Sequence, residues 1–126
     1  MPIIHIHSVA PARTEAITPM LKQTCIEGAR ALACAPSNVW AIFNQLAPEH
    51  YTVGDRAATD REPGTHPAIV TVQALAGRTL ETKTEFLRAI TRTIGSGLGI
   101  SPENIFVHYV EMNHADVWSK GSWSRS

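Results

Sequence analysis

Hydrophobic residues along the chain form four short runs, each about as long as a β-strand. Apolar and β-branched side chains dominate residues 3–9, 39–43, 68–75 and 105–110. Runs of this length and composition are typical of strands. Within each successive pair of runs, the intervening segment carries apolar residues three or four positions apart, which indicates a helix. The pattern therefore predicts two strand–helix–strand units.

The two helices differ in how clearly the sequence marks their ends. In the second, we expect Thr79 to be the N-cap and Gly97 and Gly99 to end the element. In the first, Pro19 fits only in the first turn, so the helix begins at Thr14 or at Thr18. The predicted core-facing stripes are Ile17, Leu21, Cys25, Gly28 and Leu32 in the first helix, and Leu87, Ile90, Ile94 and Leu98 in the second.

The two units are copies of one another. Within each unit, an Arg-Thr pair follows a proline by the same number of residues: Arg13-Thr14 follows Pro2, and Arg78-Thr79 follows Pro67. Between the units, Pro36 and Pro102 are one position further apart than Pro2 and Pro67. This difference predicts one short insertion between the copies. Strands joined through a helix should be parallel. We therefore expect an α+β fold: a tandem β-α-β repeat forming a four-stranded mixed sheet with two helices on one face.

Length and composition favour a single domain over residues 1–126. We expect a first β-α-β unit at 1–56, a linker at 57–66, and the second unit with a C-terminal segment at 67–126. Eleven basic residues balance eleven acidic ones, so the chain lacks the positive charge that binding nucleic acid requires. It shows no membrane-length apolar run and no secretory signal pattern, so a cytoplasmic location is expected.

A sheet covered on one face by two helices leaves its other face open. The predicted strands are apolar at both alternating sets of positions, and large apolar patches are unusual on a monomer. Packing of three such sheets around a threefold axis would cover this face. We therefore expect a homotrimer.

Pro2 is the candidate catalytic base. Once Met1 is removed, its nitrogen would be the only proline nitrogen that is not an amide, and so the only one able to take up a proton. A free α-amino group titrates at about 8, and burial beside cations disfavours its charged form. An N-terminal proline in such a place would be uncharged and basic near neutral pH.

Three strings, taken with Pro2, resemble the tautomerase superfamily, whose type member is 4-oxalocrotonate tautomerase. They are residues 76–83 (AGRTLETK), 99–105 (GISPENI) and 110–119 (VEMNHADVWS). The last two, and residues 77–83 of the first, are similar to the malonate semialdehyde decarboxylase branch. The resemblance covers nearly the whole chain. It implies two fused β-α-β units, a trimer, and a cofactor-free enzyme with an N-terminal proline.

The resemblance also implies substrate-binding residues. The arginine that the family places between the first strand and the helix of a unit matches Arg78 well, and Arg13 less well. Ala68 stands where the second unit would carry its own catalytic proline, which leaves one proline-based site per chain. Decarboxylase and dehalogenase members carry a second arginine just before the turn, which this chain lacks. Where they carry a water-activating acid, this chain has Asn38.

Aromatic residues complete the predicted site. Tyr51 and Trp118 follow the last strand of each unit, where the family places pocket walls, although both are equally suited to the trimer interface. Tyr109 offers a hydroxyl. His5 and His7 lie on one side of the first strand, but two ligands do not make a zinc site. We therefore expect no metal and no organic cofactor.

The predicted function is keto-enol tautomerisation of a small 2-oxo or 2-hydroxy acid. Arg78 would bind the substrate carboxylate, and Pro2 would move the proton. One alternative is a malonate semialdehyde decarboxylase-like enzyme or a chloroacrylate dehalogenase-like hydratase. Another is a binding protein similar to macrophage migration inhibitory factor. The sequence does not identify the natural substrate or pathway, or show whether Arg13 or a residue of a neighbouring subunit completes the site.

Overall fold

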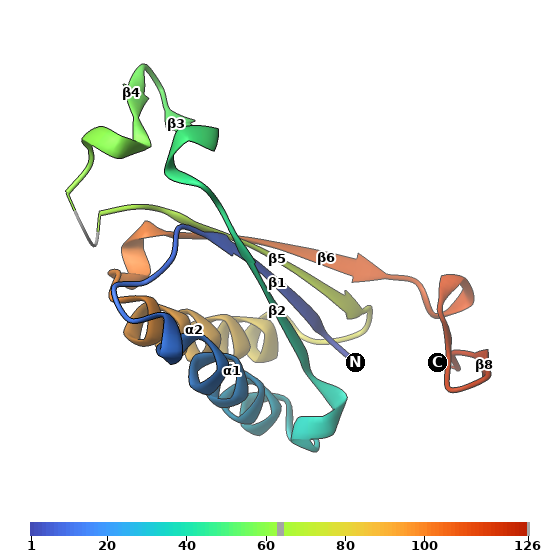
Figure 1. Cartoon of the computed structure of the whole chain (residues 1–126). Coiled ribbons are helices and arrows are strands. Elements are labelled where there is room, and N and C mark those ends of the chain that lie inside the picture. Colours follow the sequence, from blue (N-terminus) through green and yellow to red (C-terminus); the bar gives the residue numbers. More distant parts are fainter. Residues whose placement is uncertain (63–64, 126) are drawn as a thin grey trace.

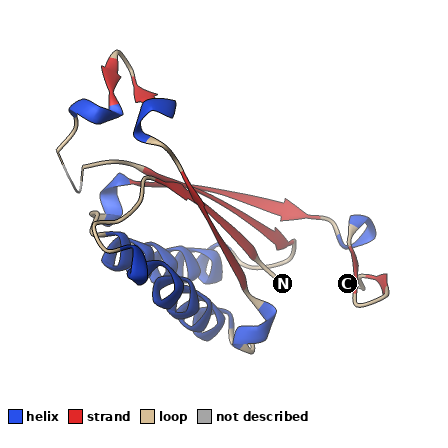
Figure 2. Ribbon diagram, viewed as in Figure 1, coloured by secondary structure: helices blue, strands red, loops and turns tan. Residues whose placement is uncertain are grey.

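The computed structural model describes residues 1–62 and 65–125. One four-stranded sheet forms a layer, and the two long helices α1 and α2 form a second layer on one of its faces (Figures 1 and 2). The strands of this sheet are β1 (Ile3–Ser8), β2 (Trp40–Gln45), β5 (Ala68–Leu75) and β6 (Ile105–Met112); the helices are α1 (Ile17–Leu32) and α2 (Leu80–Leu98). Residues 63 and 64, within the predicted linker 57–66, lie outside the described residues, as does residue 126.

The sheet has the order β2-β1-β5-β6. β1 pairs with β2 in parallel, β5 pairs with β6 in parallel, and the central pair β1 and β5 is antiparallel. The predicted mixed sheet, with parallel strands inside each unit, is therefore confirmed. The antiparallel central pair relates the two units by a pseudo-twofold axis. The beginning of β1 consequently lies beside the end of β5, because Ile3 pairs with Gln73.

The spacing between the two copies is constant along the chain, so the predicted insertion is wrong. Two short hairpins keep the spacing that separates Pro36 from Pro102: β3 (Thr52–Val53) with β4 (Arg56–Ala57), and β7 (Trp118–Ser119) with β8 (Ser122–Trp123). The sheet requires it too. Side chains in a strand alternate between the two faces of the sheet. If the copies were aligned by the shorter spacing, that between Pro2 and Pro67, the buried Ile4 would correspond to the exposed Ile69. The true counterpart of Pro2 is Ala68, not Pro67.

Short 3₁₀ turns connect the main elements. They are η1 (Thr14–Ala16), η2 (Pro36–Asn38), η3 (Pro48–His50), η4 (Ala58–Asp60), η5 (Pro102–Asn104) and η6 (His114–Asp116). The turn η1 explains the start of the first helix: neither Thr14 nor Thr18 caps it, because α1 begins at Ile17 directly after this turn. Pro19 then falls in the first turn of α1, as expected, where its missing N–H costs no hydrogen bond.

The second helix follows its prediction closely. Thr79 is the N-cap, and its hydroxyl oxygen accepts a hydrogen bond from the Thr82 amide at 3.2 Å. The helix ends at Gly99, whose φ of 72° is the left-handed C-cap conformation, whereas Gly97 lies inside the helix. Three of the four predicted stripe residues of α2 are buried: Ile90, Ile94 and Leu98.

The predicted stripe of α1 is displaced by about one position. The buried positions are Met20, Thr24, Gly28 and Ala29, while Leu21, Cys25 and Leu32 are only partly buried beside them. Gly28 allows the close approach of the two helices, because a Cβ there would lie 3.0 Å from the Phe86 ring. The strand bounds differ less. β1 ends one position early, and β2 and β6 run to Gln45 and Met112, since backbone pairing continues past the apolar runs.

The open face of the sheet carries large apolar side chains, as the alternation predicts. Trp40, Ile42, Ile69 and Phe106 are between 41% and 66% exposed in the single chain. The strand registers place all four on the face opposite to the buried Ile4 and Val70. Among the described residues, no helix is long and apolar enough to cross a membrane.

Candidate active site

Pro2 lies at the end of the sheet where strands β1 and β2 begin and strands β5 and β6 end. Its side chain is fully buried, and its carbonyl oxygen accepts a hydrogen bond from the Trp40 amide at 3.0 Å. On the other side of this end of the sheet, the Ala76 amide donates to the Met112 carbonyl at 2.9 Å. The N-terminus and the C-terminal hairpin lie at this same end of the molecule (Figure 1).

A cavity of about 430 Å³ opens beside Met1. Its walls are mainly apolar: Ile3, Leu75, Met112 and Val117, together with all three tryptophans of the chain, Trp40, Trp118 and Trp123. The volume suits a small organic molecule. The charged side chains that line it are Lys120 and Arg125, and its lining includes no aspartate or glutamate among the residues described.

The C-terminal hairpin forms one wall of this cavity. Trp118 in β7 and Trp123 in β8 pack edge to face, with their ring centroids 5.3 Å apart and an interplanar angle of 89°. Both rings are more than half exposed in the single chain. An aromatic wall of this kind excludes water from a bound ligand and strengthens electrostatic interactions beside it.

The electrostatics of the N-terminus favour an uncharged amine. Burial lowers the pKa of the Met1 amino group below its usual value, and the nearby Arg78 guanidinium lowers it further. Lys120 acts in the same direction, whereas Cys34 opposes it. The two cations that act on this amine therefore come from the β5–α2 loop and the C-terminal hairpin.

Arg78 is held in place by the loop that carries it. Its Nη1 atom donates a hydrogen bond to the Leu75 carbonyl at 3.2 Å, across a turn in which Gly77 has a φ of 118°. A side chain at Gly77 would be strained in that conformation, so glycine is needed for the turn. The half-buried Arg78 thus belongs to the same end of the sheet as Pro2.

Two other sequence-predicted residues lie at the opposite end of the sheet within one chain. Arg13 follows the end of β1, is largely exposed, and forms an ion pair with Glu15 at 3.0 Å. Tyr51 follows η3 and shares a short hydrogen bond with His66. Burial raises the pKa of the Tyr51 hydroxyl. The structure therefore does not bring Arg13 or Tyr51 to Pro2 of the same chain.

Asn38 and Tyr109 lie outside the lining of the Met1 cavity. Asn38 ends the turn η2, two positions before Trp40, and is half-buried at the Pro2 end of the sheet. Tyr109 faces the helices: its ring packs edge to face on Phe86, and the Lys83 ammonium lies 5.3 Å from its centroid. Of the predicted aromatic residues, Trp118 alone lines the cavity.

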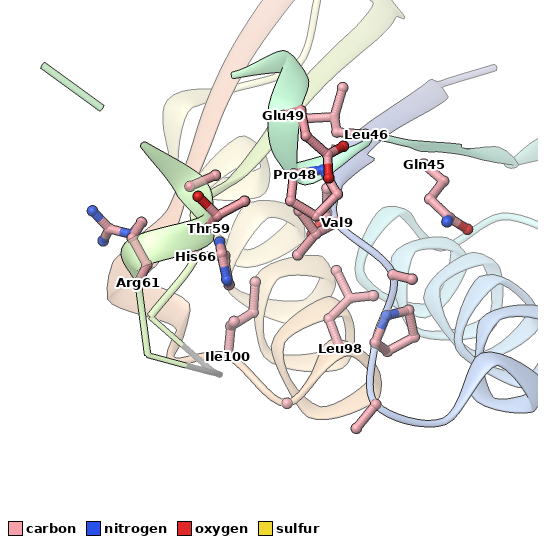
Figure 3. Close-up of a pocket in the computed structure, with 16 residues that line it drawn as sticks. Val9, Gln45, Leu46, Pro48, Glu49, Thr59, Arg61, His66, Leu98 and Ile100 are labelled. Carbon is pink, nitrogen blue, oxygen red and sulfur yellow. The ribbon is translucent and has the colours of Figure 1, made fainter. Parts of the chain in front are cut away.

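A larger cavity, of about 710 Å³, lies at the opposite end of the sheet. Figure 3 shows its walls, which include Val9, Leu46 and Leu98. It corresponds in part to the first cavity, because Val9 and Leu46 are the repeat equivalents of Leu75 and Met112. Here Ala68 and Ala12 take the places of Pro2 and Arg78. This end of the sheet therefore has no equivalent of the N-terminal proline or of the turn arginine.

Three histidines lie on the open face of the sheet: His5, His7 and His108. A side-chain hydrogen bond of 3.1 Å joins His5 Nε2 to Gln73 Oε1. Within residues 1–62 and 65–125, no group of three histidine, cysteine or acidic side chains is arranged to hold a metal ion. Both cysteines are free thiols, and burial raises the pKa of Cys25.

Most of the chain, including the loop of Arg78, matches a known family. A family model described as tautomerase enzyme covers residues 39–121, about two thirds of the chain. The chain belongs to this tautomerase family. The matched range includes Arg78 and the hairpin through Gly121, while Pro2 precedes it. No curated protein matches the sequence.

Solved structures of other tautomerase-superfamily proteins share the fold. A fused 4-OT, a symmetric trimer, superposes with a TM-score of 0.83 at 20% identity, covering 97% of this chain and 94% of that one. N1, of the cis-3-chloroacrylic acid dehalogenase family, gives 0.79 at 19% identity, covering 98% and 83%. FG41 malonate semialdehyde decarboxylase, inhibited by 3-bromopropiolate, gives 0.72 at 24%, covering 94% and 88%.

The sequence interpretation missed Lys120, Trp123 and Arg125 as neighbours of the N-terminus. Their proximity depends on the antiparallel pairing of β1 and β5, which no local pattern indicates. One signal was available: Gly54 is the repeat equivalent of Lys120, so the first unit marks this position as a turn. The tautomerase-family chain thus has more cations around Met1 than the sequence alone suggested.

Proposed function

We propose that this tautomerase-family protein is a cofactor-free keto-enol tautomerase of small 2-oxo or 2-hydroxy acids. Pro2, freed by removal of Met1, is its general base. The observation that supports this most strongly is the Met1 amine, one residue before the Pro2 nitrogen, which lies beside an apolar cavity and has its pKa lowered by burial and by Arg78. Amines in such surroundings are uncharged near neutral pH and able to accept a proton.

Each step uses residues at this end of the sheet. Arg78 pairs with the substrate carboxylate through its planar guanidinium, which matches both oxygens. The Pro2 nitrogen removes the proton of the 2-hydroxyl group as the carbonyl forms, and the protonated amine then delivers this proton to carbon. The dienol loses no atoms, so no water and no oxidant takes part. Trp118 and Trp123 keep solvent away from the enolate.

The relative rates of enol ketonisation, decarboxylation and dehalogenation test this proposal. Purified protein should ketonise phenylenolpyruvate or 2-hydroxymuconate, followed by ultraviolet absorbance, faster than it decarboxylates malonate semialdehyde or dehalogenates 3-chloroacrylate. Moving a proton needs only a base and an anchor, whereas adding water needs a further group to activate it. Asn38 cannot ionise and so cannot serve as that group.

The Asn38→Asp variant is the companion experiment, because it restores an ionisable group at this position. We expect it to raise hydration-dependent turnover relative to ketonisation. The strings shared with malonate semialdehyde decarboxylase favour decarboxylation as the second candidate. Efficient decarboxylation by the wild-type protein, with slow ketonisation, would favour that candidate and reject the tautomerase assignment.

We also propose that the protein is a homotrimer whose interface is the open face of the sheet. Trp40, Ile42, Ile69 and Phe106 give this face an apolar surface that the helices do not cover. Burial of such a surface favours association. The fused 4-OT structure with the same fold is a trimer.

A charge on the open face should prevent assembly. Phe106→Glu would place one carboxylate per chain in the proposed interface, where burying unpaired charge is costly. We expect wild-type protein to sediment at about three times the 13.7 kDa chain mass and Phe106→Glu to sediment as smaller species. Leu80→Glu is the matched control, because Leu80 is 76% exposed at the start of α2. A Phe106→Glu trimer as stable as the wild type would place the interface elsewhere.

A further inference from the structure

The turn of the C-terminal hairpin has an unusual residue at its first position. Lys120 and Gly121 connect β7 to β8, and their φ values are 55° and 79°. Two successive positive φ angles are typical of a type I′ hairpin turn, which favours asparagine, aspartate or glycine. Lysine is rare in this conformation because its Cβ crowds the backbone.

The internal repeat contains the equivalent hairpin without the lysine. The β3–β4 hairpin is the first-unit copy of β7–β8, and Gly54 occupies the place of Lys120 with a φ of 64°. Asp55, the next residue, does not share the positive φ of Gly121, so the two turns differ at their second position. At the first position, however, the positive φ is adopted by glycine, the residue that this conformation favours. Turn formation alone does not explain Lys120.

The surroundings of Lys120 indicate a different role. It lines the Met1 cavity together with Arg125. The ion pairs among the described residues are Arg13–Glu15, Arg30–Glu27 and Lys83–Glu111, so no described carboxylate neutralises Lys120. Its charge also lowers the pKa of the Met1 amine, as Arg78 does. The ammonium is thus near enough to the chain's N-terminus to act on the charge of the Met1 amine.

We propose that Lys120 is a substrate-binding residue whose ammonium pairs with the 2-oxo oxygen while Arg78 holds the carboxylate. This inference rests on the proposed tautomerase function. When Pro2 removes a proton, negative charge develops on the oxygen at C2 of the substrate. A lysine provides a compact charge that suits one such oxygen, whereas an arginine suits the two oxygens of a carboxylate. Lys120 would then stabilise the enolate more than the substrate.

Kinetics of Lys120→Met tests this role, because methionine keeps most of the length of the side chain and removes its charge. We expect kcat for enol ketonisation to fall roughly 100-fold, with KM changed much less, as for the loss of one donor to a developing oxyanion. Lys22→Met, at an exposed position of α1, is the matched control and should behave as the wild type. Wild-type kcat in Lys120→Met would overturn the proposal.

A Lys120→Gly variant separates function from folding. It should lose activity like Lys120→Met, yet its Tm should be no lower than that of the wild type, because glycine adopts the positive φ without strain. A residue kept for the hairpin would show the reverse: a lower Tm with retained kcat.

A binding experiment distinguishes failure of this inference from failure of the proposed function. Oxalate presents a carboxylate beside two further oxygens, so it imitates the enolate of a 2-oxo acid. Because all three tryptophans line the cavity, fluorescence quenching should report its binding directly. We expect Lys120→Met to weaken oxalate binding about tenfold or more, as the loss of a charge-assisted hydrogen bond does.

The possible results separate cleanly. Binding of oxalate that depends on Lys120, in a protein that ketonises no enol, would reject the tautomerase function and keep the anion site. Ketonisation with oxalate affinity unaltered by Lys120→Met would keep the tautomerase function and reject the role of Lys120. Failure of wild-type protein to bind oxalate would also reject that role.

Discussion

Pro2→Ala should lower kcat/KM for enol ketonisation by about 100-fold or more, the range contributed by a positioned general base. Alanine leaves a primary α-amine in place of the ring nitrogen, with different basicity and more conformational freedom. The Pro2 carbonyl, which accepts the Trp40 amide hydrogen bond, is a backbone group and is kept in the variant. The fold should therefore persist while turnover is lost.

The control for this variant is its assembly state and mass. Sedimentation should match the wild type, and intact mass should show that both proteins lack Met1. The mechanism assigns proton transfer to Pro2 alone. A variant that retains the wild-type rate would therefore remove Pro2 from the mechanism.

Arg78→Ala should have the next largest effect. Removing a charge-assisted pair to the substrate carboxylate costs on the order of 1.5–3 kcal/mol, which corresponds to roughly a 10- to 150-fold loss in kcat/KM. Both constants should respond: KM rises because the anchor is lost, and kcat falls because the amine is no longer tuned by the cation. Steady-state kinetics with a carboxylate enol measures both.

The pH profile gives Arg78→Ala a second readout. Arg78 lowers the pKa of the N-terminal amine, so its removal should raise that pKa. Since the uncharged amine is the active form, the acid limb of kcat/KM should move to higher pH. Arg88→Ala, at an exposed position of α2, is the control. Unchanged kinetics in Arg78→Ala but impaired kinetics in Arg13→Ala would assign the anchor to Arg13 instead.

Local patterns predicted most of the fold. The apolar runs identified the four strands, Thr79 was correctly expected to cap α2, and the placement of both helices on one face followed from the chain order. The spacing of the repeat was harder. The Arg-Thr dipeptides at Arg13 and Arg78 aligned Pro2 with Pro67. The alternation of buried side chains in β1 and β5, however, requires an even number of positions between equivalent residues, and only pairing in the sheet reveals this.

The site was less accessible to sequence reasoning than the fold. Pro2 and Arg78 were chosen by chemistry and by resemblance, and the structure places them at one end of the sheet. Lys120 and Trp123 were missed because they are far from Pro2 along the chain. Sequence separation does not reveal that they lie at the same end of the sheet as Pro2. Arg13 and Tyr51 were chosen on the same grounds as Arg78, yet they follow the ends of β1 and β2, whereas Pro2 lies where these strands begin. The antiparallel central pair brings the end of β5, and with it Arg78, to Pro2.

The central claim is that an uncharged Pro2 nitrogen is exposed to the cavity of the mature protein. Treatment with 2-oxo-3-pentynoate at neutral pH tests it directly, because this electrophilic 2-oxo acid should enter the cavity and add to an uncharged amine. Mass spectrometry of the intact protein and of its N-terminal peptide should show loss of Met1 and one adduct on Pro2. Retention of Met1, or an adduct on Cys34 with Pro2 unmodified, would contradict the account.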